Sequence, residues 1–524
     1  MNTGAHPIEG GDYEHGGLAT RALKDMLKKL GVAADDVRRA VIAAYEAEMN
    51  VVIHARRGEL SYALEPDQLD VAVLDQGPGI ADVDLAMREG YSTAPLRARE
   101  LGFGAGLGLP NIRKNSDWME IRSTPGQGTA VRFRIRFGRL SGGGRRRHSI
   151  RTQAAACSGC MRCLHVCPTA AVRVHRGAPA ILEHLCIDCS ACIETCRAGA
   201  LTMEGQNAEL KTQFDQALLA VPAAFFTEFG PHVSPQSVLA ALHRLGFEQV
   251  WIMDAWEAAL RQAVVKFAQE EARAFPVIAP MCPAVLNLIA IRFPALLEHV
   301  APFRFPLEAL LPELAGARAV VMAECPACYT ILRDHGGGDT LEIITPFGLR
   351  QAVFPLVVSG DEAAAGVHGT AGARAPEPRG VMQVTNVHHD VALLEKMENG
   401  LLSDIRVLEL FACDSGCFGS PLLHEDAFIG RTRWRKAHLE CRAPARAIRR
   451  AEPLRAQSGL RLDRSIARAM AKLTEIEELV RQLPGRDCGI CGAPTCGAMA
   501  EDIVLGRAVR DECVCLTRPQ ETTT

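Results

Sequence analysis

Apolar and polar positions in the first part of the chain repeat with two different periods. Residues 37–55 place apolar side chains at the spacing of one helix face, which predicts an amphipathic helix. Residues 71–80 form an apolar run that predicts a strand ending in an Asp-x-Gly-x-Gly motif. A glycine-rich stretch at 102–108 precedes a second helical pattern, and a tight turn at 123–128 precedes another strand. This alternation predicts a domain of mixed α/β type over residues 1–138.

The remainder of the chain divides into segments with different patterns. A Gly- and Arg-rich stretch is typical of a solvated linker, and a cysteine-dense run follows it. A long stretch then alternates helix and strand patterns around a low-complexity loop, and the last segment opens with a helical pattern. The expected boundaries are 139–149 for the linker, 150–206 for the cysteine run, 210–455 for the long stretch with its loop at 359–380, and 465–518 for the last segment. The fold class expected from these patterns is multidomain, with α/β and α+β parts.

Composition and charge narrow the classes of function. The chain has 524 residues, and length alone favours about three to five domains. A net charge of only −3 argues against a nucleic-acid partner or an anionic membrane surface. No run reaches the roughly 20 apolar residues of a bilayer span, and the first residues lack the basic-then-apolar order of a signal peptide. We therefore expect a cytoplasmic protein without nucleic-acid or membrane partners, in which clustered cysteines bind metal.

The cysteines carry the most specific spacing in the chain. All 19 follow residue 156, and eight of them form a doubled Cys-x2-Cys-x2-Cys-x3-Cys run. This is the pattern of bacterial two-cluster ferredoxins, in which the fourth cysteine of each run ligates the other cluster. It predicts two [4Fe–4S] clusters, with zinc or free thiols as the alternative. The expected ligands of the first cluster are Cys157, Cys160, Cys163 and Cys196. The expected ligands of the second are Cys186, Cys189, Cys192 and Cys167.

The amino-terminal segment carries polar and glycine residues suited to a nucleotide. Glu46 and Asn50 are four residues apart and project from one helix face, where a carboxylate can act as a base and an amide oxygen can ligate Mg2+. Glycines before a helix let backbone N–H groups approach phosphates. The other candidates are Asp75, Gly77, Gly79, Gly102, Gly104, Gly106, Gly108 and Thr129. Each motif alone is a weak indication of a nucleotide site, because a Glu/Asn pair is usually on the surface and a glycine loop before a helix is a bare turn about as often as a nucleotide site.

Together and in this order, the four motifs resemble the GHKL ATPase fold, an α/β sandwich, and within it the anti-sigma-factor serine kinases. Gly-Tyr-Ser-Thr-Ala at 90–94 and Gly-Leu-Gly-Leu-Pro-Asn at 106–111 fit that branch. The resemblance implies that Glu46 is the catalytic base, that Asn50 holds Mg2+ and that Asp75 binds the adenine amino group of ATP, with the glycine loop around the phosphates. It also implies a partner of the STAS-type anti-anti-sigma class, or a phosphatase partner.

The stretch 210–455 resembles the large catalytic domain of [FeFe]-hydrogenases, a two-lobed α/β domain that also occurs in sensory members of that family. Three cysteine loops follow the family order. The resemblance implies a further [4Fe–4S] cluster. Its ligands would be Cys282, Cys325, Cys413 and Cys417. In a true hydrogenase Cys417 would also bridge to a two-iron subsite.

Several positions depart from that family in residues that serve H2 chemistry. Met281 stands where the family has a proton-relaying cysteine, and a thioether cannot carry a proton. Cys328 replaces a lysine that grips a cyanide ligand, and Phe411 replaces a methionine. We therefore expect low or no H2 turnover, and a two-iron subsite is left as an open alternative. Cys328 is either an extra ligand or a small buried residue.

The last segment carries a fourth candidate cluster site. Its spacing, Cys-x2-Cys-x4-Cys-x16-Cys with two Cys-Gly pairs, resembles a small helical [4Fe–4S] domain of electron-transfer and corrinoid-linked proteins, with zinc as the alternative. The expected ligands are Cys488, Cys491, Cys496 and Cys513. Cys515 is expected to be a spare thiol, and Cys441 a structural or incidental one.

Two functions from different classes account for this combination. The first is an iron–sulfur sensor of redox state or of H2-linked electrons, coupled to an ATP-dependent serine/threonine kinase and supplied by a ferredoxin or hydrogenase. The alternative is an electron-transfer enzyme, either hydrogenase-like with little turnover or an ATP-gated reductase. A scaffold with a dead ATPase is a third reading, which the intact Glu46, Asn50 and Asp75 argue against. A homodimer is an open possibility.

Overall fold

The computed structural model divides the chain into two compact units. The first consists of Met1–Gly144 and Ser458–Leu483, and the second of Arg145–Gln457 and Pro484–Thr524. The described residues are 2–95, 98, 104, 106–137, 147–208, 217–272, 275–335, 340–358, 380–398, 401, 402, 404–437, 439, 444–457, 462, 463 and 465–517. Gly102, Cys441, most of the expected linker at 139–149 and nearly all of the expected loop at 359–380 lie outside them.

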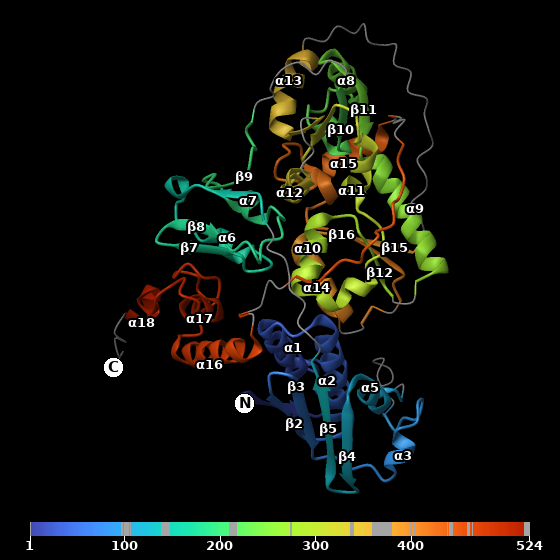
Figure 1. Ribbon diagram of the computed structural model, residues 1–524, viewed down its shortest axis with the longest axis vertical. Coiled ribbons are helices and arrows are strands. Elements are labelled where there is room, and N and C mark those ends of the chain that lie inside the picture. Colours follow the sequence, from blue (N-terminus) through green and yellow to red (C-terminus); the bar gives the residue numbers. More distant parts are fainter. Residues whose placement is uncertain are drawn as a thin grey trace. The chain divides into compact units, whose positions relative to one another are not determined.

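The first unit is an antiparallel sheet with two long helices packed on one face (Figure 1). Its elements are β1 (Asn2–Glu9), α1 (Leu18–Leu30), α2 (Ala34–His54), β2 (Arg57–Leu64), β3 (Gln68–Asp75), α3 (Val83–Ala86), α5 (Gly108–Asn115), β4 (Trp118–Thr124) and β5 (Gly128–Arg136). The strand order is β1-β2-β3-β5-β4. Leu23 and Leu27 of α1 are buried, as are Leu60, Val71 and Phe133 of the sheet, which the alternating apolar positions predict.

One further helix, α16 (Ile466–Gln482), belongs to the first unit although it comes late in the chain. It packs against α1, and Leu462 just before it donates its N–H to the Lys29 carbonyl at 2.9 Å. Asp463 accepts hydrogen bonds from the Ser465 N–H at 3.0 Å and from Lys472 at 2.9 Å. These contacts fix the start of the helix.

The second unit opens with the doubled cysteine run. There β6 (Ile150–Thr152) pairs antiparallel with β9 (Leu201–Met203), so that the two ends of the run meet. A hairpin of β7 (Val172–His175) and β8 (Ala178–Ile181) lies between them. The short helices α6 (Arg162–His165) and α7 (Ala191–Thr195) contact each other, and each carries the third cysteine of its run. The repeated cysteine spacing thus produces a repeated local structure.

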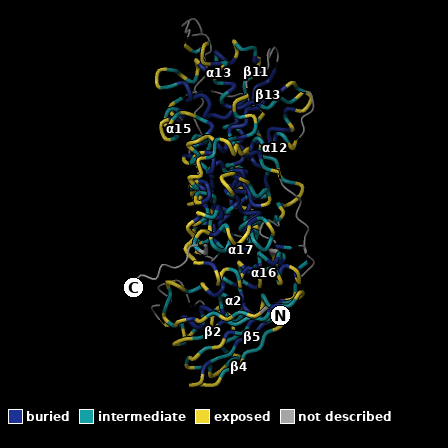
Figure 2. The backbone as a smooth tube through the Cα atoms, turned by 90° about the vertical axis from the view of Figure 1, so that its left-hand side faces the viewer, coloured by how far each residue is buried: buried dark blue, intermediate teal, exposed yellow. Residues whose placement is uncertain are grey.

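Two parallel sheets follow, in the orders β11-β10-β13-β14 and β12-β16-β15. The elements are β10 (Ala217–Val221), η2 (Ala223–Thr227), α8 (Pro235–Arg244), β11 (Phe247–Ile252), α9 (Asp254–Glu270), β12 (Val277–Ala279), α10 (Pro283–Arg292), η3 (Pro294–His299), α11 (Pro306–Leu310), η4 (Leu311–Leu314), β13 (Ala319–Met322), α12 (Pro326–His335), β14 (Leu341–Ile344), α13 (Pro346–Val358), β15 (Val381–Thr385), α14 (Val387–Glu398), β16 (Val407–Phe411), η7 (Gly416–Gly419) and α15 (Ala427–Lys436). Strands β10, β13 and β16 are buried along their whole length, which is typical of parallel sheets covered on both faces. Figure 2 shows buried positions around β13 in dark blue.

The chain ends in α17 (Cys496–Val504), η8 (Arg510–Glu512) and α18 (Val514–Thr517). This part is held on β7, where the Val174 N–H donates to the Gly492 carbonyl at 2.9 Å. Beside it, Arg173 forms an ion pair with Asp502, and their side chains are only 3% and 0% exposed. The predicted multidomain fold with α/β and α+β parts is confirmed. Among the described helices, none has the length and apolar character to cross a membrane.

Candidate functional site

Glu46 and Asn50 lie one turn apart on α2, where the first residue of α5 rests against both. A Cβ atom on Gly108 would lie 3.2 Å from Asn50 Oδ1 and 3.3 Å from Glu46 Oε2, so a larger residue would crowd both side chains. Asn111, one turn further along α5, donates from Nδ2 to Glu46 Oε1 at 2.7 Å. That bond orients the carboxylate beside the amide of Asn50.

Asp75 ends β3 and is held by backbone donors from two loops. Its Oδ1 accepts from the Gly77 N–H at 2.8 Å and from the Thr129 N–H at 3.2 Å. Ser123 Oγ accepts from the Ile80 N–H at 2.7 Å and lies 2.9 Å from Thr129 Oγ1. These bonds tie the loop after β3 to the start of β5, so the structure brings Asp75, Gly77 and Thr129 together.

Two glycines beside Asp75, the candidate Gly79 and the neighbouring Gly128, stand where a side chain would not fit. Gly79 and Gly128 have φ of 72° and 97°, and a Cβ atom there would lie 2.3 Å from the Thr124 carbonyl oxygen and 2.1 Å from the Asp75 carbonyl oxygen. Gly104 and Gly106, before α5, also have positive φ, of 85° and 74°. Glycine therefore permits the close backbone packing beside Asp75 and the turn that leads to Gly108.

The structure places four cysteines of the doubled run around one small cavity. They are Cys157, Cys160, Cys163 and Cys196. Burial and the neighbouring thiolates raise the pKa of Cys163 to about 11, so metal binding has to displace its proton. A set of four converging thiols from both runs fits a cubane cluster, and the ligand assignment remains a prediction.

The other four cysteines of the run, Cys167, Cys186, Cys189 and Cys192, are also neighbours. Burial, with the thiolate of Cys167 next in importance, raises the pKa of Cys189 to about 12. Burial with the thiolates of Cys189 and Cys167 raises the pKa of Cys192 as well. The Ala171 N–H donates to Cys167 Sγ at 3.2 Å, a contact that favours a thiolate ligand. This set likewise fits a second cubane.

A third cavity lies beyond the carboxyl ends of parallel strands. Cys282, Cys325 and Cys413 follow β12, β13 and β16, and Cys417 is on η7; all four line the cavity. This is where open α/β sheets usually hold ligands. Burial raises the pKa of Cys282 to about 12. Cys189 lines the same cavity, so this site borders the second cysteine set.

The carboxy-terminal cysteines gather beside α17. The thiolates of Cys513 and Cys488 lie close enough to Cys491 to add to the effect of burial in raising its pKa. Cys496 begins α17, and its N–H donates to Asp487 Oδ1 at 2.6 Å. Cys515 contacts the Cys488 thiol, so the thiol expected to be spare stands beside this site. The role of Cys496 as a ligand remains a prediction.

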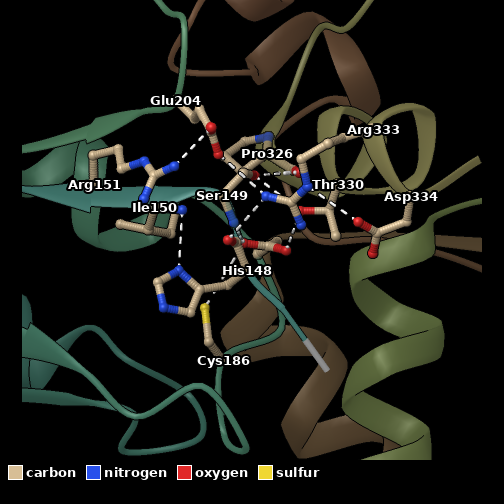
Figure 3. Close-up of polar contacts among 11 residues, drawn as sticks. His148, Ser149, Ile150, Arg151, Cys186, Glu204, Pro326, Thr330, Arg333 and Asp334 are labelled. Atoms are coloured by element: carbon tan, nitrogen blue, oxygen red, sulfur yellow. Dashed lines mark hydrogen bonds and ion pairs between the residues drawn. The ribbon is translucent and has the colours of Figure 1, made fainter. Parts of the chain in front are cut away.

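A buried polar junction connects the second cysteine set to α12 (Figure 3). The Ser149 hydroxyl donates to the Pro326 carbonyl at 2.7 Å, and the Ser149 N–H donates to Asp188 Oδ1 at 3.2 Å. The Thr330 hydroxyl donates to Asp188 Oδ2 at 2.9 Å. Asp188 follows Cys186 by two residues, and α12 starts directly after a cysteine of the third cavity. The junction therefore fixes two cysteine sites against each other.

The residues that orient the candidates, Asn111, Ser123 and Asp188, are not among those that the sequence motifs predict. The spacing of Asn111 from Gly108, one helical turn, is the signal that could have placed it on the same face. The bonds from Asp188 to Ser149 and Thr330 span 39 and 142 positions, and the bond from Ile80 to Ser123 spans 43, so no local pattern marks them.

Four segments of the chain match known families. Residues 11–135 match the histidine kinase-like ATPase domain, and residues 156–201 match the 4Fe-4S dicluster domain. Residues 217–310 match the C-terminal domain of the iron-only hydrogenase large subunit, and residues 483–515 match a putative Fe-S cluster family. These matches confirm the fusion of domains that the sequence motifs predict.

Curated relatives match the first unit. Serine/threonine-protein kinase RsbT of Bacillus subtilis is 30% identical over 119 residues, which cover 22% of this chain and 84% of RsbT. The anti-sigma F factor of Pasteuria penetrans is 32% identical over 126 residues, which cover 22% of this chain and 80% of that factor.

Among solved structures, the [FeFe]-hydrogenase HydA1 from Chlamydomonas reinhardtii aligns with a TM-score of 0.32 and 16% identity, over 50% of this chain and 91% of that one. The family assignment rests on the sequence matches instead. Through residues 11–135 the chain belongs to the histidine kinase-like ATPase family that contains RsbT and the anti-sigma F factors, and it carries that domain fused to iron–sulfur and hydrogenase-like domains.

Proposed function

We propose that this protein is an iron–sulfur redox sensor whose first unit transfers phosphate from ATP to a serine or threonine of an STAS-type anti-anti-sigma partner. One observation carries the proposal. The bond from Asn111 to Glu46, beside Asn50, forms an oriented base next to an amide oxygen in the same chain as four groups of cysteines. The names of RsbT and the anti-sigma F factors support a kinase output on such a partner.

The residues of the first unit would divide the work of phosphate transfer. ATP with Mg2+ supplies the phosphoryl group. Asn50 Oδ1 is a hard oxygen suited to Mg2+, and Asp75 is held by two backbone N–H groups in position to accept from the adenine amino group. Glu46 would take the proton of the acceptor hydroxyl, and the hydrogen bond from Asn111 orients the Glu46 carboxylate for this role. Gly104 and Gly106 would let backbone N–H groups reach the phosphates.

The second unit would supply the signal. Each cysteine set fits a [4Fe–4S] cluster, which gives four clusters by ligand counting. The third cavity shares Cys189 with the second set, so neighbouring centres could exchange electrons with a ferredoxin or hydrogenase partner. Met281 is buried on the wall of that cavity without an ionisable proton, which supports sensing over H2 turnover.

The test compares phosphate transfer in two redox states. Anaerobically purified full-length protein, reduced with dithionite or oxidised, is incubated with labelled ATP and a candidate STAS-domain protein. We expect transfer to differ at least five-fold between the states and to be lost in Glu46→Gln. Glu59→Gln, an exposed carboxylate on β2, is the matched control and should behave as the wild type. Equal transfer in both states contradicts the sensor.

A further inference from the structure

The third cavity carries more metal-binding groups than one cubane needs. Six cysteines line it, together with three carboxylates, and none of its described lining residues is basic. The family resemblance accounts for four of these cysteines, and Cys189 belongs to the second cysteine set. Asp188 is already engaged by Ser149 and Thr330. Cys328, Glu324 and Glu257 remain without an assigned role.

Glu324 is the least satisfied of these groups. It is 4% exposed, and its Oε2 atom has no hydrogen-bond partner among the described residues. Its Oε1 atom accepts from Cys328 Sγ at 3.8 Å, and its carboxyl also contacts the Cys417 thiol. A buried carboxylate without a cation or a full set of hydrogen-bond donors is strongly unfavourable. The side chain therefore lacks a positive partner.

Glu257, on α9, adds a second uncompensated carboxyl to the same wall. Burial, with Asp254 next in importance, raises its pKa to about 8. The guanidinium of Arg261 opposes this shift, but it is committed to Glu409 through bonds of 2.6 and 3.1 Å. Two acids and a thiol thus face one cavity whose described lining contains no basic residue.

We propose that Cys328, Glu324 and Glu257 bind a divalent metal ion, iron or zinc, beside the four-cysteine site. Bonds of about 2.3 Å to sulfur and 2.0 Å to oxygen, at a tetrahedral angle, put the two ligand atoms about 3.5 Å apart. Cys328 Sγ and Glu324 Oε1 are 3.8 Å apart, close to this spacing. One thiolate with carboxylate oxygens suits a borderline ion such as Fe2+ or Zn2+.

Cys328 and Glu324 are the preformed part of this metal site. Glu257 has to move its side chain to join them, since the only described trio of potential ligands whose atoms all lie within 4.8 Å is His148, Cys186 and Asp188. That trio shares Cys186 with the second cysteine set, and so it offers no separate site. On binding, the Cys328 thiol and the Glu257 carboxyl release their protons to solvent, and the divalent ion offsets two of the three negative charges of the thiolate and the two carboxylates.

The site is tested by counting metal outside the clusters. Iron, zinc and acid-labile sulfide are measured in full-length protein purified anaerobically, and Mössbauer spectra distinguish mononuclear ferrous iron from cluster iron. Cubanes contain equal iron and sulfide, so we expect about one metal per chain in excess of sulfide. Cys328→Ser and Glu324→Gln should each lower the excess at least five-fold while sulfide stays unchanged. Glu228→Gln is the control, because that buried carboxylate accepts two backbone N–H bonds, at 2.7 and 3.1 Å.

A second measurement uses the wild-type chain, in case a variant fails to fold. After chelation of loosely held ions, Co2+ should give a thiolate-to-cobalt absorption band that Zn2+ abolishes. No excess metal and no cobalt band, or an excess that survives in both variants, overturns the proposal. Infrared bands of CO and cyanide would also overturn it, since a two-iron subsite would then fill the cavity. None of these readouts depends on kinase activity.

Discussion

At the scale of single residues, the candidate kinase site depends on one hydrogen bond between α2 and α5. Asn111 binds Glu46 across 65 positions of sequence. The carboxylate pattern at Glu46 and Asn50 could be predicted from the sequence because both residues lie on one helix. The Asn111 contact could not, because it requires the packing of α5 on α2. The cysteines within each run of the doubled motif were the most predictable, since their short spacing makes the thiols converge, whereas Cys282, Cys325 and Cys413 meet only through the packing of the strands that precede them.

Replacement of Asn111 by Ala should slow phosphate transfer by about ten-fold, because Glu46 loses the donor that orients it. Glu46→Gln keeps the bond to Asn111 but removes the base, so its loss should be about 100- to 10,000-fold. Nucleotide affinity, measured by titration calorimetry, should change less than three-fold in both. Asn115→Ala, on the same helix with its amide bound to the Asn111 carbonyl, is the control. A larger loss in Asn111→Ala than in Glu46→Gln would contradict these roles.

The buried pair of Arg173 and Asp502 should be sensitive to loss of one partner. Asp502→Ala leaves the Arg173 guanidinium, only 3% exposed, without its carboxylate and also removes the carboxylate 3.0 Å from Arg507, so we expect a cost of about 3–5 kcal/mol in the free energy of unfolding. Denaturant titration of the second unit measures this cost. The exposed pair of Arg176 and Glu512 nearby is the comparison, and Arg176→Ala should cost less than about 1 kcal/mol. Similar costs for both variants would show that burial does not decide the effect.

At the scale of elements, the carboxy-terminal helices are fastened to the hairpin β7–β8 by backbone as well as side chains. Gly492 has φ of 88°, and a Cβ atom on it would lie 1.9 Å from the Val174 carbonyl oxygen. Spacing of the cysteines predicts a metal site in this segment, but it says nothing about which part of the chain the segment packs on. That information lies in contacts between residues more than 300 positions apart, such as Arg173 and Asp502.

Gly492→Ala should detach the carboxy-terminal helices from β7. Gly506→Ala is a matched control, since Gly506 also has positive φ, 72°, but its Cβ atom would meet open space. Both variants carry the strain of a left-handed residue, about 1–2 kcal/mol, and only Gly492→Ala adds the clash. Limited proteolysis after residue 484 should therefore be at least ten-fold faster in Gly492→Ala than in Gly506→Ala. Equal cleavage rates would contradict the docking on β7.

At the scale of the whole molecule, all the cysteines of the chain lie in the second unit, and the first unit has none. The separation of an ATPase unit from an iron–sulfur unit was predictable from this uneven distribution of cysteine. That α16 belongs to the first unit was not predictable. Its amphipathic pattern indicates that one face is buried, but it does not identify α1 as the partner. The domain order and the cysteine runs are thus predictable from local spacing, whereas the third cysteine set and the tertiary contacts depend on packing.

Removal of metal should destabilise the second unit and leave the first unit folded. Its buried thiols have raised pKa values and its cavities lose their contents when clusters are stripped, whereas the first unit contains no thiol. Calorimetry of holo and stripped protein should show one transition shifted down by more than about 5 °C and one unchanged. Added ATP and Mg2+ should raise the midpoint temperature only of the transition that metal removal leaves unchanged. A downward shift of both transitions would indicate that the first unit depends on metal.

Because α16 belongs to the first unit, the chain crosses between the two units three times, near residues 144, 457 and 483. A protease that cut only the Gly/Arg linker would not release the ATPase as a free fragment. It would leave α16 packed on α1 as a tethered ligand, at an effective concentration in the millimolar range for short connections. The two fragments would then stay associated through the packing of α16 on α1, and the cleaved protein would remain one complex.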